Sequence, residues 1–274
     1  MELLIISSLL GSIVGVVLGL TGAGGAILAV PLLIFGLQLN MSEAVPVALL
    51  AVCMSAAIGA VIGLKQKKVR YRAAGLIALA GSVVSPIGLW FSQRIPHEPL
   101  ILLFSLVLGY VAVSMLRKPK QNTQEHHTDV MHHHPSPEIP CMLGNADGRL
   151  IWTWPCARVL ALSGTLAGFL SGLLGVGGGF VVVPALRKVT FLQMQSILAT
   201  SLAVIALVSV VGATSAVLMG TMSWSVATPF TAGALVGMLI GNRLANRFAG
   251  PRLQQGFAWM AIFVAVGMVV NVFI

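Results

Sequence analysis

Two short glycine-rich segments are the best candidates for binding chemistry in this chain. They read GAGG at residues 22–25 and GVGGG at residues 175–179. Glycine adopts backbone conformations that are barred to other residues, and it lets a ligand approach the main chain closely. Each segment precedes a short apolar stretch, and the free N–H groups at a helix start carry a partial positive charge. The segments therefore predict an anion site, although such glycines can also serve only close helix packing.

Hydroxyl side chains near these segments could add hydrogen bonds to an anion. Thr200 and Ser201 form one pair, and Ser82 and Ser85 form another within GSVVSPIG. A buried hydroxyl is more often satisfied by its own helix backbone, so both interpretations stay open. The candidate substrate-binding residues are Thr21, Gly22, Gly24, Gly25, Ser82, Gly175, Gly177, Gly178, Gly179, Thr200 and Ser201.

Acidic residues and histidines are missing from the interior of the apolar stretches. A cation pathway or a proton relay across a membrane normally uses such a residue. The chain also has no paired nucleophile and base, and it has no cofactor motif. The sequence therefore favours an anion over a cation as cargo, and it predicts neither an enzyme nor a bound cofactor.

The composition identifies the solvent around most of this chain as lipid. Hydrophobic residues make up 57% of the 274 residues, and charged residues only 8%. A soluble domain carries about 25% charged residues, which this chain lacks for a water-facing surface. The net charge of +9 does not indicate nucleic acid, because the basic residues lie between apolar stretches. We therefore predict an all-α polytopic membrane protein with the bilayer as its surroundings.

The elements that must position the candidate residues are ten apolar stretches. We expect helices at residues 3–20, 26–39, 44–64, 73–91, 100–116, 159–174, 179–192, 197–219, 225–240 and 253–274. A polar segment separates the first five from the last five. The predicted organisation is a first transmembrane repeat at 1–116, a linker at 117–157 and a second repeat at 158–274.

The two groups of five stretches align with each other. GLTGAGGAILAVP at 19–31 matches GLLGVGGGFVVVP at 172–184, with an offset of 153 residues. The same offset pairs Met41 with Met194. An odd number of spans followed by its copy places the copies in opposite orientations, as in many secondary transporters. We expect an inverted repeat whose two glycine turns face each other near the membrane midplane.

The basic residues predict which side of the membrane each connection occupies. With both termini outside the cytoplasm and the linker inside, 15 of the 16 Lys and Arg residues are cytoplasmic, and only Arg94 is not. The opposite orientation reverses this ratio. Because cytoplasmic loops carry the excess of Lys and Arg, the first orientation is strongly favoured.

The second stretch of each half is unusual. Pro31 and Pro184 lie inside these stretches, and the later one has only about eight apolar residues before Arg187. Eight residues extend a helix by about 12 Å, whereas the hydrocarbon core is about 30 Å thick. Either a short tilted span or a re-entrant hairpin fits, and we favour a short broken or re-entrant helix.

The linker carries five histidines, namely His126, His127, His132, His133 and His134. Such tracts can bind divalent nickel, zinc or copper. The alternative is a flexible, solvated connector in which the histidines have no role of their own. Both interpretations stay open, and a metal site here is the only one that the sequence suggests.

The paired glycine motif resembles the sulfite exporter TauE/SafE family of membrane proteins. The resemblance covers nearly the whole chain except the linker, which is unusually rich in histidine for this family. It implies a permease of the bacterial inner-membrane type that moves small sulfur-containing anions such as sulfite or organosulfonates. The motif positions that carry over are Gly22, Gly24, Gly25, Gly175, Gly177 and Gly178, with Pro31 and Pro184 as structural residues.

Three hypotheses for function follow. The first is export of a small anion through a pathway between inverted halves. The second is transport of a metal ion gathered by the linker histidines. The third is a membrane partner subunit that transports nothing itself. The exact anion, the coupling ion and the oligomeric state, including a homodimer, stay open at this point.

Overall fold

The computed structural model describes residues 2–22, 25–116, 154–189, 194–248 and 251–273. Within these ranges the regular structure is entirely helical, which confirms the predicted all-α class. The helices are α1 (Glu2–Thr21), α2 (Gly25–Leu37), α3 (Met41–Lys65), α4 (Tyr71–Arg94), α5 (His97–Leu116), α6 (Trp154–Leu174), α7 (Gly179–Val189), α8 (Met194–Leu218), α9 (Trp224–Phe248) and α10 (Pro251–Phe273).

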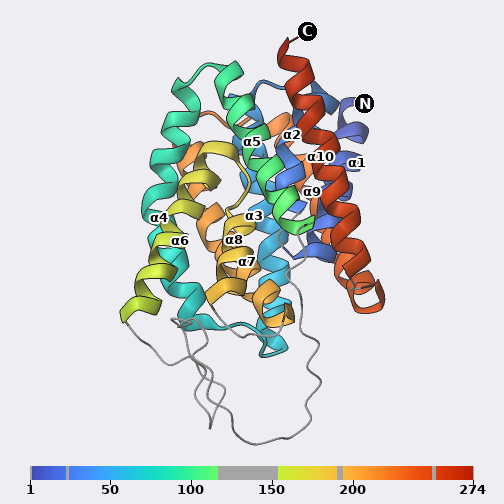
Figure 1. The fold of residues 1–274 in the computed structure, drawn as a ribbon. Helices are drawn as coiled ribbons and strands as arrows, with labels where there is room; N and C mark the ends of the chain where they lie inside the picture. Colours follow the sequence, from blue (N-terminus) through green and yellow to red (C-terminus); the bar gives the residue numbers. More distant parts are fainter. Residues whose placement is uncertain (1, 23–24, 117–153, 190–193, 249–250, 274) are drawn as a thin grey trace, which may run out of the picture.

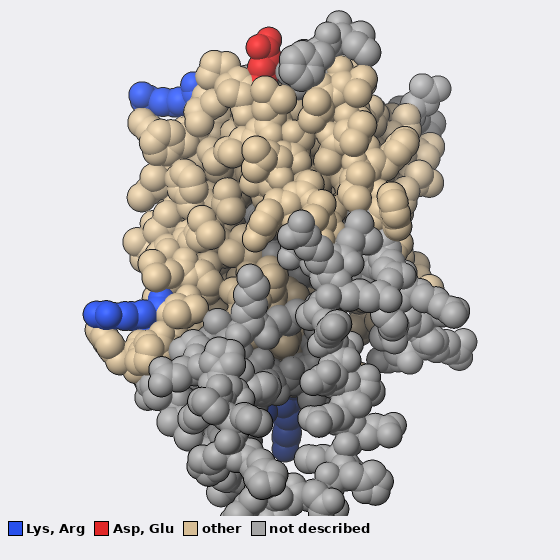
Figure 2. Space-filling model, viewed as in Figure 1, with Lys and Arg blue, Asp and Glu red and all other residues tan. Residues whose placement is uncertain are grey.

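Six of these helices, α1, α3, α4, α6, α8 and α9, are long and apolar enough to cross a bilayer. Charged side chains on the face drawn in Figure 2 lie toward the two ends, with a broad uncharged band between them. The start of α1 and the end of α10 lie at the same end of the molecule (Figure 1), as the topology prediction requires. The chain is therefore a multi-pass membrane protein.

Several helices extend beyond the apolar stretches that predicted them. Helix α9 continues from residue 240 through Arg243 to Phe248, and α4 begins at Tyr71 and ends at Arg94. Apolar stretches mark only the part of a helix that lies in lipid, while polar end turns stay helical in the interface. The sequence-based boundaries are correspondingly too short at these ends.

Helices α2 and α7 are short, as the sequence predicted. They have 13 and 11 residues, and each contains its proline, Pro31 or Pro184. Their lengths are about 20 Å and 16 Å, less than the hydrocarbon core of about 30 Å. Helix α2 returns antiparallel along α1, because the Gly25 end lies against Leu18 and Gly36 faces Leu10. The described glycines at the starts of these short helices, Gly22, Gly25, Gly175 and Gly177 to Gly179, are buried.

Glycines bring the helices of different halves into backbone contact. On α1, a Cβ at Gly15 would overlap the carbonyl of Ala234 on α9, and on α6 a Cβ at Gly168 would overlap the carbonyl of Gly81 on α4. Both pairs run parallel, and small residues are what permit such approach between membrane helices. These glycines within the helices therefore serve close helix packing, the alternative role considered for glycine from the sequence.

The contacts between helices recur with the offset of the sequence repeat. The approach of Gly59 to Leu202 is repeated by that of Gly212 to Leu49, with α3 and α8 exchanged. Gly59 plus 153 is Gly212 and Leu49 plus 153 is Leu202, so the offset converts one contact into the other. These contacts also show that α3 and α8 run antiparallel. They cross where the thiol of Cys53 points to the carbonyl of Ala206 at 3.9 Å, and these two residues are themselves 153 apart.

Candidate functional site

The turn between α6 and α7 owes its shape to three glycines. Gly175, Gly177 and Gly178 have φ values of +71°, +69° and +70°. This left-handed region is readily open only to glycine, so the GVGGG sequence is a backbone requirement. All residues from Ser171 to Gly179 are buried. Polar backbone groups of this turn are therefore held inside the protein.

Several amides of this turn are available to a ligand. The Gly175 amide donates to the Ser171 carbonyl at 2.9 Å, which closes the end of α6. The amides of Val176, Gly177 and Gly178 have no hydrogen-bond acceptor in the described part of the chain. Buried amides without acceptors are costly, and successive N–H groups in such conformations form anion-binding concavities. We call residues 175–178 the second turn.

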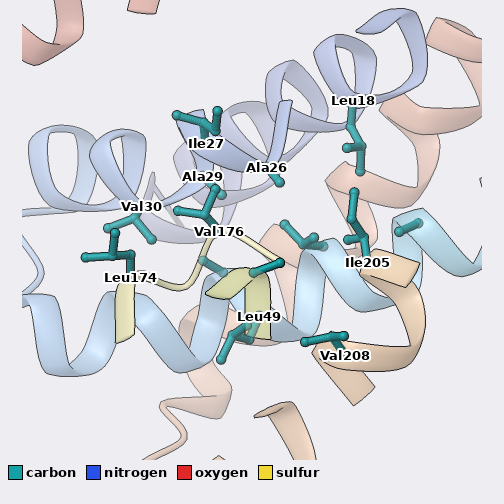
Figure 3. Packing of buried hydrophobic residues seen from close by; sticks show 14 of the residues in the cluster. Leu18, Ala26, Ile27, Ala29, Val30, Leu49, Leu174, Val176, Ile205 and Val208 are labelled. Carbon is teal, nitrogen blue, oxygen red and sulfur yellow. The ribbon is translucent and has the colours of Figure 1, made fainter. Parts of the chain in front are cut away.

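The second turn reaches the centre of the bundle. A Cβ at Gly177 would lie 2.8 Å from Ile205 Cγ2 and 2.9 Å from Val52 Cγ1. Val52 and Ile205 are the chain neighbours of Cys53 and Ala206, which mark the crossing of α3 and α8. Figure 3 shows the turn at Val176 close to buried residues of neighbouring helices, which include Val30, Leu49 and Ile205. The turn is therefore inserted between the two halves.

Serine hydroxyls without partners lie beside the second turn. The Ser209 Oγ of α8 is 3.2 Å from the position of a Cβ on Gly177. One turn further along α8, a Cβ on Gly212 would lie 3.2 Å from the Ser85 Oγ of α4. Within the described residues, six buried hydroxyl oxygens have no hydrogen-bond partner, namely those of Ser55, Ser85, Ser92, Ser171, Ser209 and Thr231. Two of these hydroxyls therefore lie along one face of α8, that of Ser209 beside Gly177 and that of Ser85 beside Gly212.

The turn between α1 and α2, which we call the first turn (residues 21–25), is built differently. Gly22 has φ +74°, and its amide donates to the Leu18 carbonyl at 2.8 Å. The Thr21 hydroxyl donates to the Val17 carbonyl at 2.7 Å and accepts from the Gly25 amide at 3.2 Å. The predicted site residue Gly24 lies outside the described residues. In the described part of this turn, the amides of Gly22 and Gly25 therefore both have acceptors, at Leu18 and Thr21.

Gly22 and Gly175 lie far from the crossing of α3 and α8. A Cβ at Gly22 would lie 2.9 Å from Leu198, near the start of α8, and a Cβ at Gly175 would lie 3.0 Å from Val45, near the start of α3. Each contacted residue is eight positions before the crossing, which is about 12 Å along its helix. Among the described glycines, it is Gly177 that contacts the crossing itself.

The predicted hydroxyl pair Thr200–Ser201 bonds mainly to its own helix. Thr200 Oγ1 donates to the Ser196 carbonyl at 2.6 Å and accepts from the Arg70 amide at 3.1 Å. Ser201 Oγ donates to the Leu198 carbonyl at 2.8 Å. Ser82 is half-buried on α4, about one turn before Ser85. The structure therefore does not bring Thr200 and Ser201 to the second turn as free donors, and their role toward a substrate stays a prediction.

Ser171 and Ser209 were not predicted from the sequence. Ser85 was noted beside Ser82 but was not among the candidate substrate-binding residues. A signal for Ser171 was present, because it directly precedes the GLLGVGGG motif. Nothing in the local sequence of Ser209 distinguishes it from other serines in apolar helices. Its position beside Gly177 arises only from the packing of α8 on the second turn.

The surroundings of the second turn carry no charge. Among the described residues, the buried polar side chains are all serine or threonine. A small cavity of about 10 Å³ on one side of the turn is lined by apolar side chains, including Ile27, Phe104 and Val176. The arrangement can therefore donate neutral hydrogen bonds to an anion, and it offers no ionised partner.

The described residues contain no group of three or more His, Cys, Asp or Glu side chains that could hold a metal ion. The proposed metal ligands His126, His127, His132, His133 and His134 lie outside the described residues. The metal hypothesis for the linker therefore stays a prediction from sequence.

Comparison with known proteins places similarity along almost the entire chain. Residues 7–268 match the family model of the sulfite exporter TauE/SafE. A probable membrane transporter protein of Xylella fastidiosa is 28% identical over 260 residues, which cover 93% of this chain and 91% of that protein. The probable membrane transporter protein YunE of Bacillus subtilis is 26% identical and covers 89% of both chains. No solved structure matches.

Proposed function

This chain belongs to the sulfite exporter TauE/SafE family of membrane transporters, and on that premise we propose that it is a permease exporting a small oxyanion, sulfite or an organosulfonate. The observation that carries the proposal is the buried second turn at the crossing of α3 and α8. The amides of Val176, Gly177 and Gly178 have no acceptor in the described part of the chain, and the Ser209 hydroxyl lies beside Gly177. An anion would be held there by neutral donors between the two halves.

The pathway would lie between two inverted halves. The inversion is supported by the antiparallel crossing of α3 and α8 and by contacts that recur, with partners exchanged, at the offset of 153. A two-fold axis through the contact of Cys53 with Ala206 would relate the halves. Rocking of one half against the other about this crossing would expose the second turn to each side alternately.

The orientation follows from the basic residues. We place both termini outside the cytoplasm of a bacterial-type inner membrane, because 15 of 16 Lys and Arg residues then face the cytoplasm. Labelling of a cysteine introduced at Arg94 from outside intact cells tests this orientation.

Export of an anion needs no proton carrier in the protein. An inside-negative membrane potential favours anion efflux by about 2.3 kcal/mol per charge for each 100 mV. The bound anion would lack a countercharge at the second turn, which keeps its binding weak enough for release. A facilitated exit route is therefore physically sufficient.

The test is flux of radiolabelled sulfite from liposomes that contain only this purified chain. We expect saturable efflux with the wild-type protein and its loss in Gly177→Leu, because a bulky side chain fills the space between Val52 and Ile205. Gly109→Leu is the matched control, since nothing lies within 4 Å of a Cβ at that position. Absence of flux for sulfite, organosulfonates and carboxylates alike would reject the transporter proposal and favour a non-transporting subunit.

A further inference from the structure

The hydroxyls at the second turn have no equivalents at the first. Ser85, Ser171 and Ser209 correspond, by the offset of 153, to Met238, Leu18 and Ala56. These counterparts are buried and apolar. Where the Ser85 Oγ approaches Gly212, the Cε of Met238 occupies the equivalent place against Gly59. The backbone contacts are symmetric, but the polar groups are not.

We propose that the substrate is held on one side only, by Ser85, Ser209 and the amides of the second turn, and that this neutral site takes a singly charged oxyanion. The proposal rests on the proposed transport function and assigns the binding residues and the charge of the substrate. The proposed site includes side chains outside the two glycine turns. Ser85 comes from the first half of the chain and Ser209 from the second.

The two hydroxyls lie along one face of α8, and the Ser209 hydroxyl is the one beside the turn. Ser209 Oγ faces Gly177, and the Ser85 Oγ faces Gly212, three residues later on α8. Residues at this spacing lie on one helix face, about 5–6 Å apart between their Cβ atoms. Both serines are fully buried and have no hydrogen-bond partner in the described part of the chain. Their hydroxyls are therefore unpartnered donors at one face of α8, with Ser209 beside Gly177 and Ser85 beside Gly212.

Unpartnered hydroxyls at a buried position need an explanation. Leaving such a group unsatisfied costs about 1–3 kcal/mol, and most serines in membrane helices avoid this by bonding their own backbone. Ser7 does so, with its Oγ 2.6 Å from the Leu3 carbonyl. A ligand oxygen that accepts from Ser85 and Ser209 removes the cost.

Because no charged side chain of the described residues lies near the turn, the site should prefer singly charged oxyanions to doubly charged ones. Every Lys and Arg of this chain lies in a connection or within six residues of a helix end. Along α7 the next basic residue after Gly179 is Arg187, about 12 Å away along the helix. The cost of removing an ion from water rises with the square of its charge, so a dianion loses about four times as much as a monoanion. Neutral donors therefore favour hydrogensulfite or an alkanesulfonate over the sulfite or sulfate dianion.

The first test removes the hydroxyls. Ser85→Ala and Ser209→Ala are each expected to lower kcat/KM for methanesulfonate flux about tenfold, mainly through KM, since each loses one hydrogen bond to an anion. Ser7→Ala is the matched control, because it removes a buried hydroxyl that already bonds its own helix. Unchanged KM in both Ser85→Ala and Ser209→Ala, with normal flux, would overturn this inference while leaving the transporter proposal intact.

The second test varies the charge of the anion. Methanesulfonate stays singly charged at all working pH values, whereas sulfite changes from hydrogensulfite to the dianion near neutral pH. We expect sulfite flux to fall as pH rises from mildly acidic to mildly alkaline, while methanesulfonate flux stays constant and external sulfate fails to compete. Competition by sulfate equal to that by methanesulfonate would overturn the single-charge assignment. Loss of all fluxes, by contrast, would reject the transporter proposal itself.

Discussion

The two glycine turns occupy matching places in the two halves, yet they differ in what they offer. Within the described residues, three successive amides of the second turn have no acceptor, and the unpartnered Ser209 hydroxyl lies beside Gly177. At the described part of the first turn, Thr21 bonds both the preceding helix and the Gly25 amide. The two turns nevertheless pack in the same way, because Gly22 contacts Leu198 and its repeat equivalent Gly175 contacts Val45, the equivalent of Leu198. The comparison teaches that the repeat conserves the backbone arrangement, while a few side chains decide where a ligand can bind.

The largest effect should come from breaking the shared packing. Gly15→Leu and Gly168→Leu each push a side chain into the carbonyl of a partner helix, at Ala234 or Gly81. Rigid backbone cannot make room, so we expect both variants to fail to yield a folded, monodisperse protein. Size-exclusion chromatography after membrane extraction measures this, with Gly109→Leu as the tolerated control. A clear difference between the two variants would contradict the equivalence of the two helix interfaces.

A smaller effect should separate the two turns. Gly22→Ala and Gly177→Ala place a Cβ at left-handed φ values of +74° and +69°, so both should lose about 1 kcal/mol or more of stability. We expect only Gly177→Ala to lose transport, because its methyl group also lies against Val52, Ile205 and the Ser209 hydroxyl.

Thermal unfolding and liposome flux on the same preparations provide the two readouts. Equal loss of transport in the Gly22 and Gly177 variants, at equal stability, would indicate that the pathway uses both turns alike. The one-sided assignment would then fail.

The smallest effect is expected at Thr200. Thr200→Val removes the acceptor of the Arg70 amide, so we expect a stability loss of about 1 kcal/mol without a change in KM. The matched position in the first half, Val47, already lacks a hydroxyl. A rise in KM at unchanged stability would instead show that Thr200 binds substrate, as the sequence-based prediction for the pair Thr200–Ser201 proposed.

Much of the fold could be predicted because lipid restricts the choices. A chain with so few charges must form helices that satisfy their own backbone groups, so apolar stretches translate almost directly into α1, α3, α6 and α8. The short length of α2 and α7 was predictable from Pro31 and Pro184, and for α7 also from Arg187, which follows only about eight apolar residues. The ends of the helices were harder to predict, as for α9, because polar residues in the end turns give no hydropathy signal.

The candidate site was predictable only in its backbone part. Glycine at positions 175, 177 and 178 is required by positive φ, a constraint that local sequence expresses directly. The hydroxyl groups of the site could not be predicted in this way. In the sequence, Thr200 and Ser201 look as suitable for binding an anion as Ser85 and Ser209. Only the three-dimensional partners of each oxygen distinguish a serine bonded to its own helix from one aimed at the turn.

The sequence by itself determined that this protein lies in a membrane, that its halves repeat with an offset of 153, and that two glycine turns precede short helices. These properties depend on composition and on local backbone geometry, which neighbouring residues encode. Tertiary structure alone decided that Ser209 of the second half lies beside Gly177, and that Ser85 of the first half lies beside Gly212, three residues further along α8. That outcome depends on α8 packing against both α4 and the second turn, an arrangement between residues distant in the chain.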